Sequence, residues 1–268
     1  MNEQRDANLR FTAVVLAGDR GPQDPVAVAT GASCKALSPV AGRPMILRVL
    51  RALNQSAEVG KIVLSGPARS NLEQNQPLLQ GIDSGQWDWL APAATPSTSA
   101  WEALQTVPEQ TPVLLTTADH ALLRHEIVDH FCRAARQQPC DLAVAFVNHE
   151  RVMSAFPGMR RTASRFRDGA FCGCNLFAFL TPEARTAADF WRRVEHQRKH
   201  PWRMIRILGW RPLIGYLTRR LTLEATLETL GRRLGIRICP ILLPFPEAAV
   251  DVDKASDHEA VERILETR

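Results

Sequence analysis

No stretch of about 18 or more consecutive apolar residues occurs in this chain, so a membrane-spanning helix is not expected. The first ten residues, MNEQRDANLR, carry charges but no apolar segment follows them, as it would in a secretory signal. We therefore expect a cytoplasmic protein. The sequence also shows no internal repeat and no low-complexity tail, which argues against a solenoid or a disordered appendage.

Cysteine is scarce and scattered. Of the six cysteines, only Cys172 and Cys174 lie close together, and no second pair follows at zinc-finger spacing. A structural zinc site is therefore not expected. Reduced and mostly buried thiols fit an intracellular chain better than disulfides do.

The 268 residues, 45% of them hydrophobic, are enough to bury one full α/β core. Short apolar runs alternate with helical patterns along the chain, which predicts an α/β fold with a mainly parallel sheet and helices on both faces. We expect a single domain over residues 1–268. The strands are predicted at residues 11–16, 61–65, 111–117, 141–147, 170–179 and 236–243, and helices at 100–107, 126–137 and 257–266.

The first predicted strand, residues 11–16, breaks at once into a loop that suits a triphosphate. Glycines such as Gly18 and Gly21 let backbone N–H groups approach phosphate oxygens, and Arg20 and Lys35 would neutralise them. A helical pattern follows the loop. Strand, basic glycine loop and helix together form a nucleotide-binding arrangement in outline, although a plain connecting loop has the same pattern.

Several polar residues stand at positions where a ligand is expected. Asp119 follows a buried strand, at the end where open parallel sheets place their ligands, but it could instead cap the next helix. Asn175 interrupts an apolar strand, either satisfied by neighbouring backbone or in contact with a ligand. Asp251 and Asp253 precede the final helix, and the second of them could cap it.

The net charge of +5 is concentrated in one segment. Residues 185–237 contain thirteen Lys or Arg against four Asp or Glu. Within them, residues 199–221 (KHPWRMIRILGWRPLIGYLTRRL) interleave arginines with aromatic and aliphatic side chains. This segment is either a helical insertion packed on the core or an interfacial helix in peripheral contact with a membrane. Nucleic-acid binding is not expected, because no reading motif is present and the segment is too apolar.

Three separated motifs resemble the MobA-like NTP transferases, which include molybdenum-cofactor guanylyltransferase and sugar-1-phosphate nucleotidyltransferases. LAGDRG, Lys35 and GRPMILRVL are similar to that family's LAGG-x-G, K and G-x-P-L signature. TTADHALL at 116–123 resembles its strand-end aspartate, and DVDKASDHEAVERIL at 251–265 its closing motif. The resemblance covers almost the whole chain apart from the basic insertion, which we place at about residues 183–235.

The resemblance implies a Rossmann-like nucleotidyltransferase (GT-A-like) core that transfers an NMP group from an NTP to a phosphorylated acceptor and releases pyrophosphate. Acceptors would be small molecules or lipid-linked phosphates. By this resemblance Mg²⁺ would be the cofactor. The implied roles are catalysis for Lys35, Arg20 and Asp119; nucleotide binding for Leu16, Ala17, Gly18, Ser97 and Ser99; acceptor binding for Asn175; and metal binding for Asp119 and Asp251, with Asp253 a substitute for Asp251.

Two departures from the family pattern keep other functions open. Asp19 stands where the family has a second loop glycine, and a carboxylate beside a triphosphate would repel it unless it points away or holds a metal. Residues 254–256 are Lys-Ala-Ser where Thr-Pro-Glu is expected. The alternative is a non-catalytic nucleotide-binding or membrane-associated partner protein on the same fold. Molybdenum-cofactor guanylyl transfer is a narrower enzymatic alternative.

Overall fold

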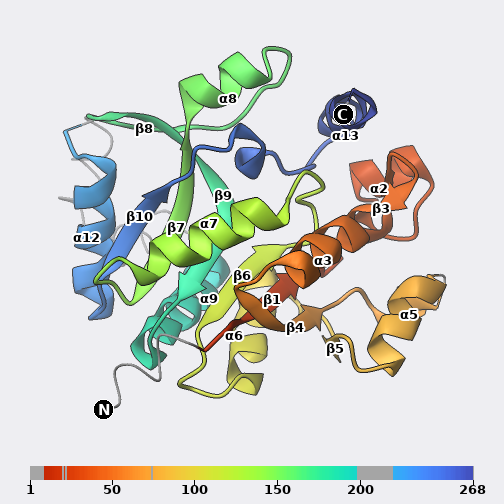
Figure 1. Ribbon diagram of the computed structural model, residues 1–268, viewed down its shortest axis with the longest axis horizontal. Coiled ribbons are helices and arrows are strands. Elements are labelled where there is room, and N and C mark those ends of the chain that lie inside the picture. Colours follow the sequence, from red (N-terminus) through yellow and green to blue (C-terminus); the bar gives the residue numbers. More distant parts are fainter. Residues whose placement is uncertain (1–8, 20, 22, 74, 198–219, 268) are drawn as a thin grey trace.

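A computed structural model gives the structure of residues 9–267, except for residues 20, 22, 74 and 198–219. Its centre is an eight-stranded sheet in the order β10-β7-β9-β6-β1-β4-β5, with β8 paired to β9 (Figure 1). The strands are β1 Phe11–Leu16, β4 Val59–Ser65, β5 Asp88–Leu90, β6 Val113–Thr117, β7 Leu142–Asn148, β8 Ser164–Phe166, β9 Gly169–Phe179 and β10 Ile238–Leu242; β2 Pro39–Val40 and β3 Arg43–Pro44 form a separate small pair.

The sheet is mixed but mostly parallel, as the alternation of strands and helices predicts. β1 pairs in parallel with β4 and β6, β4 with β5, and β7 with β10. β9 runs antiparallel between β6 and β7, and the hairpin partner β8 is antiparallel to β9. The parallel order places the carboxyl ends of β1 and β6 side by side, and a ligand site is expected there.

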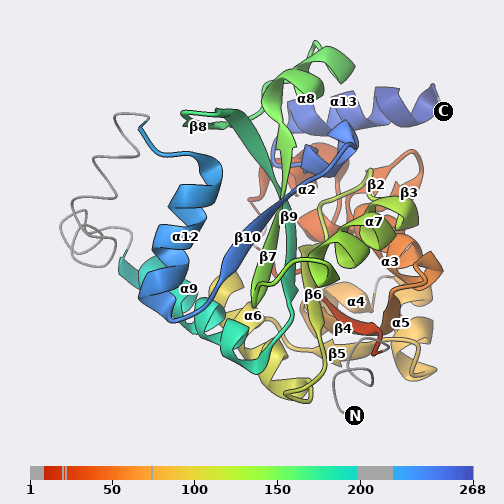
Figure 2. The ribbon, with the colours of Figure 1, turned by 60° about the vertical axis from the view of Figure 1, so that its left-hand side comes forward.

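Helices cover both faces of the sheet. They are α2 Pro25–Thr30, α3 Met45–Gln55, α4 Arg69–Leu72, α5 Gln76–Asp83, α6 Pro96–Thr106, α7 His125–Arg136, α8 His149–Ala155, α9 Thr186–Gln197, α12 Leu223–Leu234 and α13 Ala255–Glu266; the short 3-10 turns are η1 Lys35–Leu37, η2 Pro182–Arg185 and η3 Pro246–Ala249. Figures 1 and 2 show α3 and α7 side by side on one face, with α6, α9 and α12 on the other.

The alternation of side chains in β1 produces two separate hydrophobic layers. Phe11, Ala13 and Val15 belong to the buried cluster beneath α3 and α7, whereas Val14 and Leu16 belong to the cluster beneath α6, α9 and α12. Because successive side chains of a strand point to opposite faces, a continuously apolar strand is buried on both sides. The mostly apolar sequence of residues 11–16, with Thr12 as its polar member, thus corresponds to a central position in the sheet.

A third, smaller apolar cluster holds the C-terminal segment against the site end of the sheet. Val26 of α2, Met45 of α3 and Leu122 pack with Val252 and with Val261 of α13. All of these side chains are essentially excluded from solvent. This packing fixes where the polar residues around Val252 can lie.

Most predicted elements are present, and the differences have local causes. The helix expected at 100–107 begins earlier, because Thr95, not Ser99, accepts a hydrogen bond from the Thr98 N–H and caps α6. The stretch after Gly21, expected to be a loop, contains α2, which Asp24 caps by accepting from Val26 and Ala27. Residues 68–95, for which no strand or helix is predicted, contain α4, α5 and β5.

Candidate functional site

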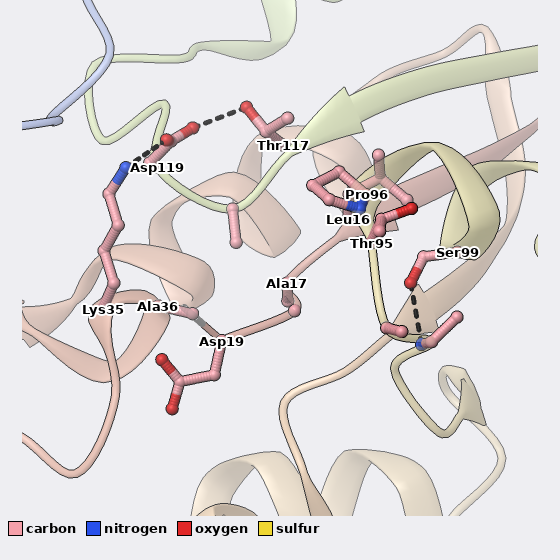
Figure 3. A pocket seen from close by; sticks show the side chains of 14 residues that line it. Leu16, Ala17, Asp19, Lys35, Ala36, Thr95, Pro96, Ser99, Thr117 and Asp119 are labelled. Carbon is pink, nitrogen blue, oxygen red and sulfur yellow. Dashed lines mark hydrogen bonds and ion pairs between the residues drawn. The ribbon is translucent and has the colours of Figure 1, made fainter. Parts of the chain in front are cut away.

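A pocket of about 400 Å³ opens at the carboxyl ends of β1 and β6 (Figure 3). Its lining comes from four separate parts of the chain: residues 16–19, 35–36, 93–96 with 99, and 117–119. The first and last of these follow adjacent parallel strands, so the topology alone brings them together. The predicted residues Leu16, Ala17, Gly18, Lys35, Ser99 and Asp119 all line this pocket.

Lys35 links two acidic segments of the chain. Its ammonium lies 2.6 Å from Asp119 Oδ2 and 2.7 Å from Asp253 Oδ1, and its side chain is only 10% exposed. Thr117 donates a hydrogen bond of 2.5 Å to the other oxygen of Asp119. The backbone N–H of Val252 donates to the Asp119 carbonyl at 3.1 Å, which ties the two acidic segments together.

Lys35 and the carboxylates that it contacts stabilise each other's charged form. Burial alone would lower the pKa of Lys35, but the carboxylates of Asp119 and Asp253 outweigh it and raise that pKa. Burial would likewise raise the pKa of Asp119, but Lys35 and smaller contributions lower it. The stabilisation from Lys35 is lost as pH rises beyond its ordinary pKa of 10.5, and that from Asp119 as pH falls below its ordinary 3.8. The pair therefore stays charged throughout the physiological range.

His120 adds no positive charge beside this pair at neutral pH. Its side chain is essentially buried, and burial lowers its pKa to about 4. The imidazole next to Asp119 is therefore neutral. The cation that contacts Asp119 and Asp253 is Lys35.

Asp119, Asp251 and Asp253 form an acidic cluster in which one carboxylate oxygen from each lies within 4.8 Å of the others. Within the part of the chain that the structure describes, it is the one group of three or more potential metal ligands. A set made only of carboxylate oxygens suits a hard cation such as Mg²⁺ rather than zinc. The donor chemistry therefore fits the cofactor that the sequence implies.

Neither Asp119 nor Asp253 caps a helix with its side chain, a role that the sequence alone left open for both. The carboxylate of Asp119 is bonded to Thr117 and Lys35, and α7 begins only at His125. At α13 it is Asp257 whose carboxylate accepts the backbone N–H groups of Asp253 and Lys254. The side chains of the cluster are thus left facing one another.

Asn175 and Arg161 lie on the Asp251 side of the cluster. Asn175 donates to Asp251 Oδ2 at 3.1 Å from a backbone with φ of +47°, a left-handed conformation that Asn tolerates better than most residues. Pairing between β7 and β9 shifts register at this point, so the bulge aims the amide at the site. Arg161 forms a close ion pair with the Asp251 carboxylate and donates to its carbonyl at 3.0 Å.

Arg161 is not among the predicted site residues, because it lies in a basic and polar stretch, residues 159–168, that has the pattern of a hairpin or loop. Ser164 to Phe166 do form the hairpin strand β8. The one available signal was Arg160-Arg161 among polar residues, and nothing there indicates a partner ninety residues further along. Its side chain is 12% exposed, which marks it as part of the site rather than a solvated arginine.

The two serines expected to contact the base lie in different surroundings. Ser99 is at the pocket, where its hydroxyl accepts the Ala93 N–H at 2.9 Å and holds the wall of residues 93–96 in place. Ser97 is fully buried and does not line the pocket; its hydroxyl and its N–H both donate to Glu195 of α9. Direct contact between Ser97 and a base does not fit that placement.

Asp19 is held by its own loop. Its carboxylate accepts the Gly21 N–H at 3.1 Å and the Asn71 amide at 3.4 Å. Figure 3 shows the side chain pointing away from the Lys35–Asp119 pair. A carboxylate at this glycine position would repel a triphosphate, and this orientation of the Asp19 side chain reduces that repulsion. Arg20 lies outside the described residues.

Gly66 packs closely against the backbone of Ala17 and Gly18 just after β1, and an alanine at this position should displace that backbone. Its φ is +87°, and a Cβ would lie 2.7 Å from the Ala17 carbonyl oxygen and 3.0 Å from the Gly18 nitrogen. We expect Gly66→Ala to lower the free energy of unfolding by about 2 kcal/mol and to weaken nucleotide binding, because it displaces the loop.

Gly85→Ala is the matched control for this prediction. Gly85 has a φ of +72°, but its Cβ would have no neighbour within 4 Å. It should lose stability by strain alone, about 1 kcal/mol, and keep nucleotide affinity. Equal nucleotide affinities in the two variants, measured by calorimetry, would show that Gly66 does not position the loop.

The basic segment at residues 199–221 lies, apart from its last two residues, outside the described part of the chain. The helices that flank it, α9 and α12, pack on the sheet. Across the described residues, no helix combines the length and apolar character needed to cross a bilayer. The suggested membrane contact finds no support in these residues.

All six cysteines, Cys172 and Cys174 included, are free thiols.

Comparison with known proteins points to one family. A family model described as the MobA-like NTP transferase domain matches residues 13–237. A hypothetical transferase from Thermus thermophilus shares 31% sequence identity; the match covers 93% of this chain and 100% of that one, with a TM-score of 0.76. No curated protein matches the chain.

More distant solved structures share the fold. A CMP:2-keto-3-deoxy-manno-octonic acid synthetase complexed with CTP is 14% identical, with a TM-score of 0.55, over 96% of this chain and 99% of that one. A 4-diphosphocytidyl-2C-methyl-D-erythritol synthase from Anaerococcus prevotii is 11% identical, with a TM-score of 0.57, over the same shares of the two chains. At these identities the likeness concerns the architecture alone.

Proposed function

This chain belongs to the MobA-like NTP transferase family, and from that premise we propose that it transfers a nucleoside monophosphate group from an NTP to a phosphorylated acceptor, with Mg²⁺ as cofactor. The observation that carries the proposal is the cluster of Lys35, Asp119 and Asp253 beside a pocket at the carboxyl ends of β1 and β6. We also propose that the chain acts as one nucleotidyltransferase domain with a helical insertion at about residues 183–235.

The proposed reaction needs no protein nucleophile. An acceptor phosphate oxygen is already anionic; it forms a bond to the α-phosphorus, and the bond from that phosphorus to the bridging oxygen of the β-phosphate breaks. Pyrophosphate leaves with the electron pair, and no proton must move. The task of the site is to bring two anions together and to stabilise the developing charge.

Each part of the site has a place in that task. The glycine loop at Gly18 and the ammonium of Lys35 would bind the triphosphate, while the wall of residues 93–96 with Ser99 would bind the nucleoside. Asp119, Asp251 and Asp253 would hold the metal. When bound, Mg²⁺ supplies charge neutralisation and alignment of the phosphates.

Arg161 and Asn175 would bind the acceptor phosphate. Both contact the Asp251 carboxylate, and an arginine fork suits a phosphate. The Asp251 carboxylate holds this guanidinium in place, so the cation is already positioned for an acceptor.

Arg161→Gln should therefore impair acceptor use more than nucleotide binding. We expect kcat/KM for the acceptor to fall about a hundredfold, with a smaller change in the Kd for the NTP. The neighbouring Arg160 is exposed, and Arg160→Gln should leave both constants unchanged. An equal loss of NTP affinity and acceptor kcat/KM would contradict the assignment of Arg161 to the acceptor.

The proposal is tested by NTP-dependent release of pyrophosphate. Thermal shifts with each of the four NTPs and Mg²⁺ first identify the base, because a ligand that binds only the folded state raises its apparent stability. CTP is tested first, since the distant structural neighbours are named for cytidylyl chemistry. GTP tests the narrower alternative, molybdenum-cofactor guanylyl transfer.

Pyrophosphate release is then measured with small phosphorylated acceptors and with lipid phosphates in vesicles. Acceptor-dependent release establishes the activity, and the better class identifies the acceptor. A protein that binds an Mg–NTP tightly but releases no pyrophosphate with either class would instead favour the non-catalytic nucleotide-binding alternative.

A further inference from the structure

A second pocket, distinct from the catalytic one, lies between α3 and the start of α7. Its volume is about 320 Å³, and none of its lining residues also lines the catalytic pocket. Figures 1 and 2 show α3 and α7 running side by side on the same face of the sheet. We call it the arginine pocket, because Arg43, Arg48, Arg51 and Arg124 line it together with His125.

The positive charge of this pocket is not balanced by the carboxylates around it. Glu126, which also lines the pocket, lies 3.6 Å from Arg124 and 3.4 Å from His125. Arg124 has a second partner in Glu247 at 2.8 Å. Among the described residues, no carboxylate lies within ion-pair distance of Arg43, Arg48 or Arg51. Three guanidinium groups thus remain without a counter-charge.

Arg48 is held rigidly at the centre of the group. It donates to the Val40 carbonyl at 2.9 and 2.7 Å and to the Ala41 carbonyl at 3.2 Å. These acceptors are neutral and fix the guanidinium without cancelling its charge. Arg51, one helical turn further along α3, lies on the same face. Burial, together with the nearby charges of Arg43 and Arg51, lowers the pKa of Arg48.

Glu262, a further acid near Arg48, does not neutralise these arginines either. Glu262 of α13 acts on Arg48 only at a distance, while its carboxylate accepts the Ala41 N–H at 2.8 Å. Solvated surface arginines usually spread apart, but here they converge on a concave pocket walled by the apolar residues Ala121, Leu122 and Leu123. An anion in this pocket would relieve their mutual repulsion.

We propose that the arginine pocket binds an anion carrying phosphoryl groups with two or more negative charges, of which inorganic pyrophosphate is the simplest. Guanidinium forks match phosphate oxygens in geometry as well as in charge. The pocket volume accommodates two phosphoryl groups. A nucleoside diphosphate presents the same groups, so its diphosphate is a second source of this chemistry.

The proposal is tested by isothermal titration of the full chain, without divalent metal, with inorganic pyrophosphate in one arm and ADP in the other. The test variant is Arg43→Gln with Arg51→Gln, since both side chains are exposed and glutamine keeps the helix propensity at Arg51 of α3. Lys35→Met reports binding at the catalytic pocket. Arg160→Gln with Arg165→Gln removes two exposed charges elsewhere.

We expect wild type, Lys35→Met and the Arg160/Arg165 control to bind pyrophosphate with similar Kd, and the Arg43/Arg51 variant to bind at least about tenfold more weakly. The same pattern with ADP, at higher affinity than pyrophosphate, also supports the site and names a nucleotide as its ligand. Unchanged Kd in the Arg43/Arg51 variant, loss of binding in Lys35→Met, or no binding of either ligand to wild type would each overturn the proposal. Failure of the catalytic proposal would leave these outcomes unaffected.

Discussion

Asp119→Asn should reduce pyrophosphate release about a thousandfold while the protein stays folded. Asparagine has the same shape and can still accept from Thr117, but it removes one of three carboxylates from the acidic cluster. It also removes one of the two counter-charges of Lys35, and Asp253 remains as the other. Loss of activity without unfolding is therefore the expected signature.

The measurement is the initial rate of pyrophosphate release, with Mn²⁺ binding followed in parallel by electron paramagnetic resonance. Asp88→Asn is a matched control, because Asp88 forms an exposed ion pair with Lys61 far from the cluster. It should keep full activity and metal affinity. If Asp119→Asn bound Mn²⁺ as tightly as wild type, Asp119 would not be a metal ligand.

Lys35→Met should produce two effects of opposite sign, tighter metal binding and slower turnover. The Lys35 ammonium pairs with Asp119 and Asp253, two of the three residues that would hold the metal. Its removal takes away a competing positive charge, so Mn²⁺ affinity should rise at least about tenfold. The triphosphate loses its cation at the same time, so turnover should fall about a hundredfold.

The stability of this variant should depend on the metal. Without Lys35, two neighbouring carboxylates repel each other, and the free energy of unfolding of the metal-free protein should fall by about 3 kcal/mol. Saturating Mg²⁺ should recover much of that loss. Lys61→Met, at an exposed ion pair, should show neither effect. A Lys35→Met protein with unchanged metal affinity would mean that Lys35 and the metal do not share the carboxylates.

The sequence predicts the fold well because its signals are local. A largely apolar run such as Phe11–Leu16 indicates a central strand whatever its partners are, and the alternation with helices indicates a parallel sheet. The antiparallel direction of β9 is not readable in this way. It depends on which strands the chain places on either side, and no residue within the strand encodes that choice.

The site was predictable where a residue follows directly from the end of a strand. Gly18 and Asp119 are of this kind, because the end of a parallel strand is itself the signal. Arg161 and the Ser97–Glu195 contact depend on side chains that meet across long sequence separations. A single sequence does not contain that information, and a charged residue in a loop looks the same whether it is solvated or paired.

The backbone hydrogen bond from Val252 to the Asp119 carbonyl has a consequence for the order in which the protein becomes functional. Two of the three clustered carboxylates, Asp251 and Asp253, come after every described strand of the sheet in the sequence. Strands β1 and β6 can therefore pair, and much of the core can form, before these carboxylates are synthesised. A nascent chain gains its full cation-binding chemistry only later, when the segment around Val252 docks against the Asp119 carbonyl.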